Sequence, residues 1–165
     1  MRIPIVNEQD EIIGYKDRED RSQKDITRVS ALWVTDKEGN VLLAQRAFSK
    51  KHHPGLWGPA VAGTVEEGET YESNIIKEAE EEIGLTEFNP ILGPKIRRSS
   101  IHEYFCQWFT FVADHDYMFT KRDGEVEEVK WFSQNELIQL LQEKPQIFLE
   151  GMKNYSVDFF KIKQI

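Results

Sequence analysis

Apolar and polar positions divide the chain into short β-strands and a few helices. Two apolar runs on either side of a polar turn predict an N-terminal hairpin over about residues 1–16. Residues 27–35, a turn at 36–40 and residues 41–46 predict a second hairpin. We expect further strands at residues 60–62, 91–98, 102–112 and 125–132. The segments between them read as loops at residues 16–25, 49–58 and 114–123.

The clearest helical pattern covers residues 70–83. Thr70 suits an N-cap, Glu72 suits the first turn, and Gly84 is a natural stop. At about 100° per residue, one flank of this helix is apolar, with Ile75, Ile76, Ala79 and Ile83. Two further helices are predicted at residues 136–142, opened by Ser133, and from Pro145 to about Tyr155. Mixed strands between helices predict an α+β fold, an α/β/α sandwich with a mixed sheet.

The neighbouring flank of the first helix carries three acidic residues, Glu78, Glu81 and Glu82, at positions i, i+3 and i+4. Their carboxylates share one helix face, where like charges repel by roughly 0.2–0.5 kcal/mol per pair. A fold that accepts this repulsion commonly holds a cation there, and hard oxygen ligands suit Mg²⁺, with Mn²⁺ as the alternative ion.

Length and composition narrow the function classes. The chain has 165 residues, which predicts one domain over residues 1–165, and its formal net charge is −8. We therefore expect no stable nucleic-acid complex and no binding to a membrane surface, although a divalent cation would still allow a phosphate substrate. A single cysteine, Cys106, fits a reducing cytoplasm. We expect no signal peptide and no transmembrane helix.

The acidic stretch is part of a longer motif over residues 63–85. Its spacing is Gly63, five residues, Glu69, seven residues, then Lys77-Glu78-Ala79-x-Glu81-Glu82-x-Gly84-Leu85. This resembles the Nudix box, whose pattern is G-x5-E-x7-R-E-U-x-E-E-x-G-U. The resemblance implies a Nudix fold and Mg²⁺-dependent hydrolysis of a diphosphate bond, as in a nucleoside diphosphate linked to another group.

The resemblance also implies roles for single residues. In the family, the positions of Glu81 and Glu82 bind metal, and the position of Glu78 binds metal or acts as base. The backbone carbonyl at Gly63 is a further ligand, and Glu69 supports the loop. The catalytic set implied here is Glu78, Glu82 and Lys77. Lys77 replaces the usual arginine, and its ammonium cannot form a planar fork to a carboxylate, so we expect Glu78 to be held less rigidly.

A wider resemblance, over residues 7–69, is to Nudix proteins related to isopentenyl-diphosphate isomerase. Isomerases of that type use a cysteine where this chain has Ala62. They use histidine ligands where it has Asp20, Thr27 and Thr64. Without that thiol and those imidazoles the same proton-transfer mechanism should not operate. We therefore interpret the chain as a hydrolase on an isomerase-like frame.

Several residues outside the motif are candidates for the substrate or metal. Lys16, Arg46 and Lys50 match positions that contact diphosphate in the isomerases; a solvated basic loop is the alternative. Glu125 or Glu127 could supply a further metal ligand, or belong to a charged edge strand. Trp57 could line the cleft or belong to the core, or could stack on a base. The four histidines lack metal-ligand spacing and read as surface or loop residues.

Three hypotheses follow for the function. The first is a Mg²⁺-dependent diphosphate hydrolase, the second is a diphosphate-binding module without turnover, and the third is an isomerase. The substrate cannot be read from the sequence, because specificity lies in loops and cleft walls. A homodimer through the N-terminal hairpin or an outer strand is left open.

Overall fold

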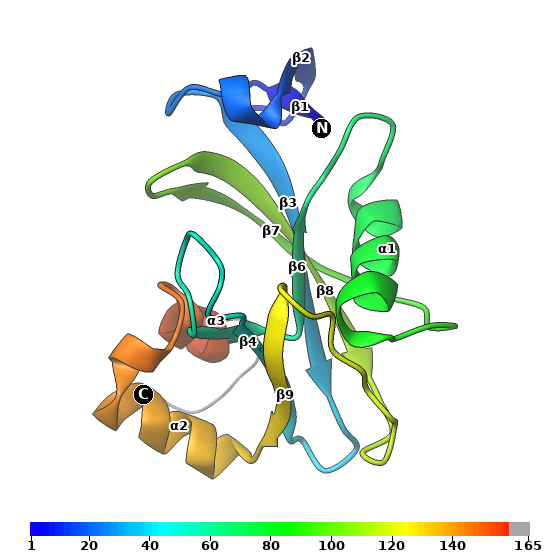
Figure 1. The fold of residues 1–165 in the computed structure, drawn as a ribbon, viewed down its shortest axis with the longest axis vertical. Helices are drawn as coiled ribbons and strands as arrows, with labels where there is room; N and C mark the ends of the chain where they lie inside the picture. The colour runs from blue at the N-terminus through cyan, green and yellow to red at the C-terminus, as the bar shows by residue number, and fades with distance from the viewer. Residues whose placement is uncertain (159–165) are drawn as a thin grey trace.

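A ten-residue strand, β3 (Ile26–Thr35), organises the computed structural model, which describes residues 1–158 (Figure 1). It pairs in parallel with β8 (Glu103–Val112) and antiparallel with β1 (Arg2–Val6), β4 (Val41–Arg46) and β6 (Val61–Thr64). Outside these lie β2 (Ile12–Asp17) on β1, β7 (Ile91–Ser99) on β8, and β5 (Trp57–Pro59) and β9 (Val126–Phe132) on β4. The sheet is mixed, as predicted.

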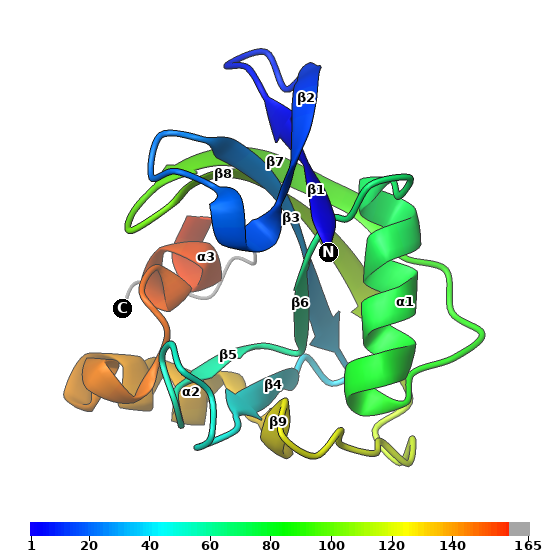
Figure 2. The same cartoon turned by 45° about the horizontal axis from the view of Figure 1, so that its top comes forward.

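Helices cover both faces of this sheet (Figures 1 and 2). Along β3 the side chains alternate, so that Trp33 packs in one core layer and Leu32 in the other. Helix α1 (Tyr71–Ile83) closes the Leu32 layer with Ile75, Ala79 and Ile83. Helices α2 (Gln134–Glu143) and α3 (Met152–Asp158) close the Trp33 layer with Leu137, Leu141 and Met152. The predicted α/β/α sandwich is confirmed.

The ends of α1 lie where the sequence predicts them. The Thr70 hydroxyl accepts a hydrogen bond from the Ser73 backbone, and the Ser73 hydroxyl accepts one from the Thr70 backbone. This reciprocal cap satisfies two N–H groups that the first helical turn leaves free. Gly84 ends the helix in the left-handed conformation, with φ of 67°, which a glycine adopts without a steric penalty.

The N-terminal hairpin is confirmed, and its turn is fastened to the body of the molecule through Asp10. This carboxylate receives Arg28 Nε at 2.7 Å and Lys95 Nζ at 2.6 Å. The Tyr71 hydroxyl donates to the same carboxylate at 3.0 Å. A short 3₁₀ helix, η1 (Arg18–Asp20), follows β2 within the predicted loop. Three elements therefore hold the hairpin in a fixed position beside α1.

Two predicted segments are wrong in detail. The loop expected at residues 49–58 ends early, because Trp57 already pairs with Gln45 in the sheet. The helix expected from Pro145 to about Tyr155 is interrupted after η2 (Pro145–Ile147), and α3 begins only at Met152. In the interruption Phe148 is extended and forms a β-bridge with Trp57, and such long-range pairing has no local sequence signal.

No helix among residues 1–158 combines the length and the apolar character needed to cross a membrane. Residues 159–165, which the predicted single domain includes, lie outside the described residues.

Candidate functional site

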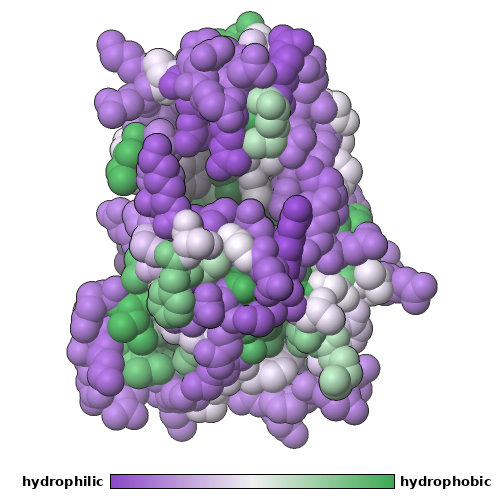
Figure 3. All heavy atoms as spheres, in the orientation of Figure 1, coloured by the Kyte–Doolittle hydropathy of each residue, from purple (hydrophilic) through white to green (hydrophobic). Residues whose placement is uncertain are grey.

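A cleft of about 340 Å³ lies between α1, β6 and the segments that flank β4 and β9. Glu78, Glu81 and Glu82 line it from α1, Gly63 lines it from β6, and Glu125 lines it from the loop before β9. Figure 3 shows the molecule hollowed across the middle of this face, with hydrophilic side chains around the hollow. The structure thus brings together the three carboxylates that the helical spacing places on one face.

Gly63 permits a close approach between β6 and α1. A Cβ atom at this position would lie 2.5 Å from Glu78 Cγ and 2.7 Å from Glu78 Cδ. Both separations are well inside van der Waals contact. The Glu78 side chain therefore occupies the space that any side chain at position 63 would fill, and the Gly63 backbone lies directly against the carboxylate.

In the cleft, burial together with repulsion between negatively charged carboxylates raises the pKa values of Glu78 and Glu82. Burial, followed by the charges of Glu78 and Glu125, raises the pKa of Glu82 to about 8. Burial also raises the pKa of Glu78; the Lys77 ammonium opposes this rise and the charge of Glu81 adds to it. A cation among these oxygens would favour their ionised forms. The site is therefore built to gain from a positive charge.

Lys77 holds the loop between β6 and α1, which carries Glu66 and Glu69, against the helix. Its ammonium lies 2.5 Å from Glu69 Oε1, 3.1 Å from Glu66 Oε1 and 3.6 Å from Glu78 Oε1. Burial would lower the pKa of Lys77, but hydrogen bonds to Glu69 and Glu66 raise it above its ordinary value. The Lys77–Glu78 distance is that of an ion pair without a hydrogen bond, so Lys77 holds Glu69 more firmly than Glu78.

Glu69 has further partners that fix the loop. Its other oxygen, Oε2, accepts hydrogen bonds from the Glu66 backbone and from Asn74 Nδ2, both at 2.9 Å. Burial would raise the pKa of Glu69, but Lys77 and these two donors lower it. Asn74 is fully buried and also bonds the Thr64 carbonyl and the Ser30 hydroxyl. Glu69 therefore lies behind the cleft, outside its lining.

Cationic side chains line the cleft opposite the carboxylates. Lys50 Nζ lies 2.5 Å from Glu125 Oε2, and Arg122 Nη1 lies 3.3 Å from Glu81 Oε2. Arg46 donates through Nε to the His52 carbonyl at 3.1 Å. Burial lowers the pKa of Arg46, while the charges of Glu82 and Glu125 raise it. Arg46 and Lys50 thus meet in one cleft.

Besides Lys77 and Glu69, three candidates from the sequence lie outside this lining. Lys16 pairs with Asp25 at 2.6 Å. Trp57 packs edge-on against Phe132 in the core layer under α2, with ring centroids 5.1 Å apart. Glu127 lines a separate cleft with Phe119 and Lys121.

The regular alternation of side chains along β9 is interrupted by a β-bulge. Gln45 pairs with Glu128, but the next residue, Arg46, pairs with Val126. Glu127 is therefore the extra residue on β9. It faces away from the acidic cleft, and Glu125, which precedes the strand, reaches into it.

Two cationic residues of the cleft were not predicted from the sequence. Arg18 lies on η1 and Arg122 on the loop between β8 and β9, and both line the cleft. Each stands in a charged segment without periodic pattern, so only the fold brings it to the site. The second arginine could have been inferred from its position three residues before Glu125.

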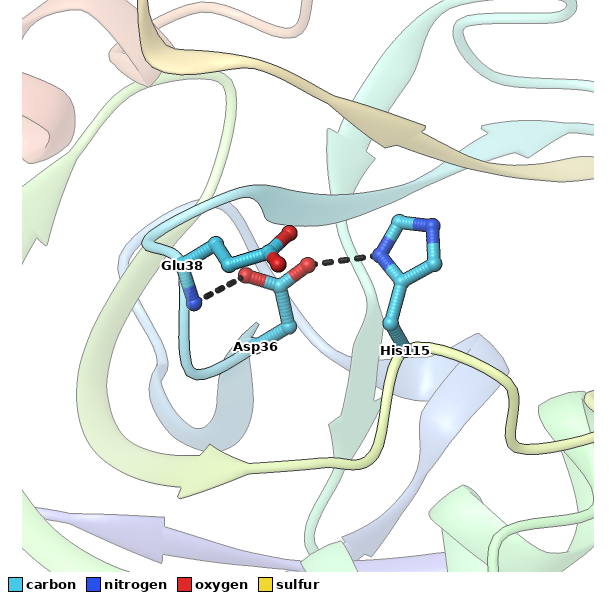
Figure 4. A group of neighbouring side chains, drawn as sticks. All are labelled: Asp36, Glu38 and His115. Carbon is cyan, nitrogen blue, oxygen red and sulfur yellow. Dashed lines mark hydrogen bonds and ion pairs between the residues drawn. The ribbon is translucent and has the colours of Figure 1, made fainter.

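A second group of side chains that could bind a metal ion lies outside the motif (Figure 4). Asp36 and Glu38 belong to the β3–β4 turn, and His115 belongs to the loop after β8. Within residues 1–158 it is the one trio of such side chains whose ligand atoms all lie within 4.8 Å of one another. Asp36 already accepts hydrogen bonds from the Glu38 and Asn40 backbones and lies 2.6 Å from His115 Nδ1.

These contacts explain the electrostatics of that group. Burial would raise the pKa of Asp36, but hydrogen bonds from Asn40, His115 and the turn backbone lower it to about 2. The carboxylate is thus occupied in shaping the turn. Exposed His115 lies in a loop, as the sequence indicates, and stacks on Trp131 with ring centroids 5.2 Å apart.

The donor set of the acidic cleft fits a hard divalent cation. It combines carboxylate oxygens from Glu78, Glu81, Glu82 and Glu125 with the Gly63 backbone, which lies against the Glu78 side chain. The raised pKa values of Glu78 and Glu82 also support a cation in this cleft, because a cation would favour the ionised forms of both carboxyls.

Comparison with known proteins gives one family. A family model described as the NUDIX domain matches residues 25–150. An uncharacterized Nudix hydrolase of Yersinia pestis is 36% identical over 84 residues, which make up 50% of this chain and 46% of that protein. The match therefore covers about half the length of this relative. Isopentenyl-diphosphate Delta-isomerase 2 of Photorhabdus laumondii is 27% identical over 154 residues, or 90% of this chain and 86% of the isomerase.

Among solved structures, a MutT NUDIX hydrolase from Burkholderia pseudomallei resembles the chain with a TM-score of 0.63. The match covers 78% of this chain and 93% of that protein at 17% sequence identity. At this level of identity the likeness concerns the fold, and it confirms the predicted mixed sheet between helices.

Proposed function

The chain belongs to the Nudix family, and from this premise we propose that it hydrolyses a phosphoanhydride bond in an organic diphosphate, with Mg²⁺ as its metal. The observation that carries the proposal is the meeting of Glu78, Glu82 and Gly63 in one cleft with Arg46 and Lys50. Carboxylates suit a metal and cations suit phosphate oxygens, so the cleft offers both halves of a metal-diphosphate site.

Glu78, Glu81, Glu82 and the Gly63 carbonyl would hold the metal, with Glu125 as a further ligand from the loop before β9. Bound there, Mg²⁺ or Mn²⁺ would neutralise charge on the phosphate and make a water molecule more acidic. The three glutamates are fixed on α1 and Gly63 on β6, which supports a defined geometry.

The protein groups divide the remaining work. Glu78 takes the proton of the attacking water, because it is the carboxylate held between Lys77 and the Gly63 backbone. Arg46 and Lys50 bind the phosphate oxygens and orient them. Lys77 acts as a positioning residue: it ties Glu66 and Glu69 to α1 and keeps Glu78 in place from one side.

The proposal is tested by measuring product release from a panel of organic diphosphates, with and without Mg²⁺. The panel includes nucleotide sugars, dinucleoside polyphosphates, oxidised nucleoside triphosphates, coenzymes and prenyl diphosphates. Glu78→Gln and Glu82→Gln should each lower kcat by at least about 100-fold. Glu80→Gln is the matched control, because Glu80 is exposed on the same helix and lies outside the cleft. Full activity in the Glu78 or Glu82 variant would contradict the assigned roles.

An isomerase function has less support. Cys106 is the one cysteine of the chain, and it lies 4% exposed in the core layer under α2 and α3. Burial raises the pKa of its thiol to about 12. The described residues that line the cleft include Ala62 and Thr64 and neither cysteine nor histidine. Conversion of isopentenyl to dimethylallyl diphosphate would overturn this reading.

One observation favours a binding module without turnover: Lys77 approaches Glu78 only to 3.6 Å and leaves it without a hydrogen bond from this cation. Tight Mg²⁺-dependent binding of a diphosphate, with no product over long incubation, would decide for this second function.

A further inference from the structure

The rim of the cleft across from α1 carries arginines for which the described part of the chain offers no partner. Arg18 lines the cleft from η1, and Arg21 follows at the end of the same 3₁₀ turn. Among residues 1–158 neither side chain forms a hydrogen bond or an ion pair with a protein group. Arg21 is nevertheless partly buried. A cation that is removed from water and left unpaired costs free energy, which an anionic ligand can offset.

A further basic side chain lies near these two arginines. The β7–β8 turn approaches the η1 loop in the views of Figures 1 and 2, and it carries His102. Burial, followed by the charges of Arg21, His52 and Arg18, lowers the pKa of His102. Burial and the charge of Arg18 likewise lower the pKa of Arg21. The two arginines of the η1 loop and the imidazole of the β7–β8 turn therefore lie close enough to influence one another.

Arg18 also connects this rim to the diphosphate side of the cleft. Its charge acts on Arg46, and both guanidinium groups line the same cleft. The carboxylates of Glu19 and Asp20 are exposed beside it and form no ion pair with it within the described residues. Among the described residues the Arg18 guanidinium is therefore not tied to a carboxylate of its own loop.

The loop that carries Arg18 is held in place at several points. The Arg18 backbone N–H donates to the Met1 carbonyl at 2.9 Å. Asp25 accepts hydrogen bonds from Lys16 at 2.6 Å and from the Ser22 backbone at 2.7 Å. A guanidinium on a fixed loop loses less freedom on binding a ligand, which strengthens recognition.

Resting on the proposed function, we infer that Arg18, with Arg21 and His102 behind it, forms a second anion subsite. This subsite binds a phosphate group that follows the diphosphate undergoing cleavage. A guanidinium presents paired donors that match two phosphate oxygens. Arg18 is therefore a specificity-determining residue, and the chain favours substrates with three or more linked phosphates over those with two.

Binding of inorganic probes tests this subsite without turnover. The probes are the methylene-bridged analogues of pyrophosphate and tripolyphosphate, whose P–C–P links resist hydrolysis, and they are titrated calorimetrically in the presence of Mg²⁺. The wild-type chain should bind the three-phosphate probe about 10-fold or more tightly than the two-phosphate probe. Arg18→Gln and Arg21→Gln should each reduce this preference, with affinity for the two-phosphate probe within twofold of wild type.

Lys24→Gln is the matched control, because Lys24 is an exposed cation of the same loop and lies outside the cleft lining. It should leave the preference unchanged. Equal affinity of the wild-type chain for the two probes would overturn the subsite, as would an equal loss for both probes in Arg18→Gln. Urea unfolding of each variant verifies that the fold is retained.

The outcome is separable from that of the proposed function. A chain that hydrolyses diphosphates but shows no Arg18-dependent preference retains the proposed function and loses the subsite. A chain that prefers the three-phosphate probe through Arg18, yet releases no product from any substrate, retains the subsite and loses the hydrolase.

Discussion

Replacing Gly63 with alanine should displace the Glu78 carboxylate with little change elsewhere. The new Cβ would lie 2.5 Å from Glu78 Cγ, whereas carbon atoms in contact are at least about 3.5 Å apart. Glu78 must therefore move by about 1 Å, or β6 and α1 must separate by the same amount.

The magnitude follows from this displacement. A misplacement of about 1 Å in a reacting group can reduce the rate by about 100-fold, which corresponds to about 2.7 kcal/mol in the activation free energy. The free energy of unfolding should fall by about 1–3 kcal/mol, as for an overpacked site. We therefore expect Gly63→Ala to be folded and nearly inactive.

The assay compares kcat for a diphosphate substrate with Mg²⁺ and the midpoint of urea unfolding. Gly14→Ala is the matched control, since a Cβ at Gly14 meets no atom within 4 Å. It should keep both quantities close to those of the wild type. Activity of Gly63→Ala within twofold of wild type would refute the reasoning that the β6 backbone and Glu78 share one site.

Three further predictions concern single side chains. In metal-free buffer, folded Glu82 keeps a proton that the unfolded chain releases above the ordinary glutamate pKa of 4.5. The unfolding free energy should therefore fall by about 1 kcal/mol per pH unit between this pH and about pH 8, the pKa of folded Glu82. Urea titrations should show a flatter profile for Glu82→Gln, and an unchanged slope would contradict the burial of this carboxyl. Lys77→Gln should lower kcat about 10-fold by freeing Glu69 and Glu78, whereas Lys77→Arg should maintain or raise it; equal rates in both variants would exclude a positioning role. Asp10→Asn should reduce the unfolding free energy by about 1–3 kcal/mol at pH 7. Burial alone would raise the pKa of Asp10, but Lys95 and Arg28 lower it, so this difference should vanish as the pH falls through the folded pKa. A difference that persists after the carboxyl has been protonated would argue against the ion pairs.

Features with a local cause were predictable from the sequence. The caps of α1 depend on Thr70 and Gly84, and each acts through bonds to backbone a few residues away. The two core layers follow from alternation along β3, where neighbouring side chains such as Leu32 and Trp33 point to opposite faces. The three acidic residues of α1 share a face for the same periodic reason, so this side of the cleft was predicted.

Features that depend on distant pairing were not predictable. The bulge opposite Arg46 turns Glu127 away from the cleft, and only the register between β4 and β9 reveals it. Phe148 interrupts a predicted helix because it meets Trp57 in the sheet. Arg18 reaches the cleft because the N-terminal hairpin folds back beside α1, a placement that no short sequence pattern carries.

The most direct test of the account is the position of a divalent cation in the crystal. An anomalous difference map from a crystal soaked in Mn²⁺ should show a peak bonded to carboxylate oxygens of Glu78 and Glu82, beside the Gly63 carbonyl. A peak confined to Asp36, Glu38 and His115, or three α1 carboxylates spread apart with no ion among them, would contradict the central claim.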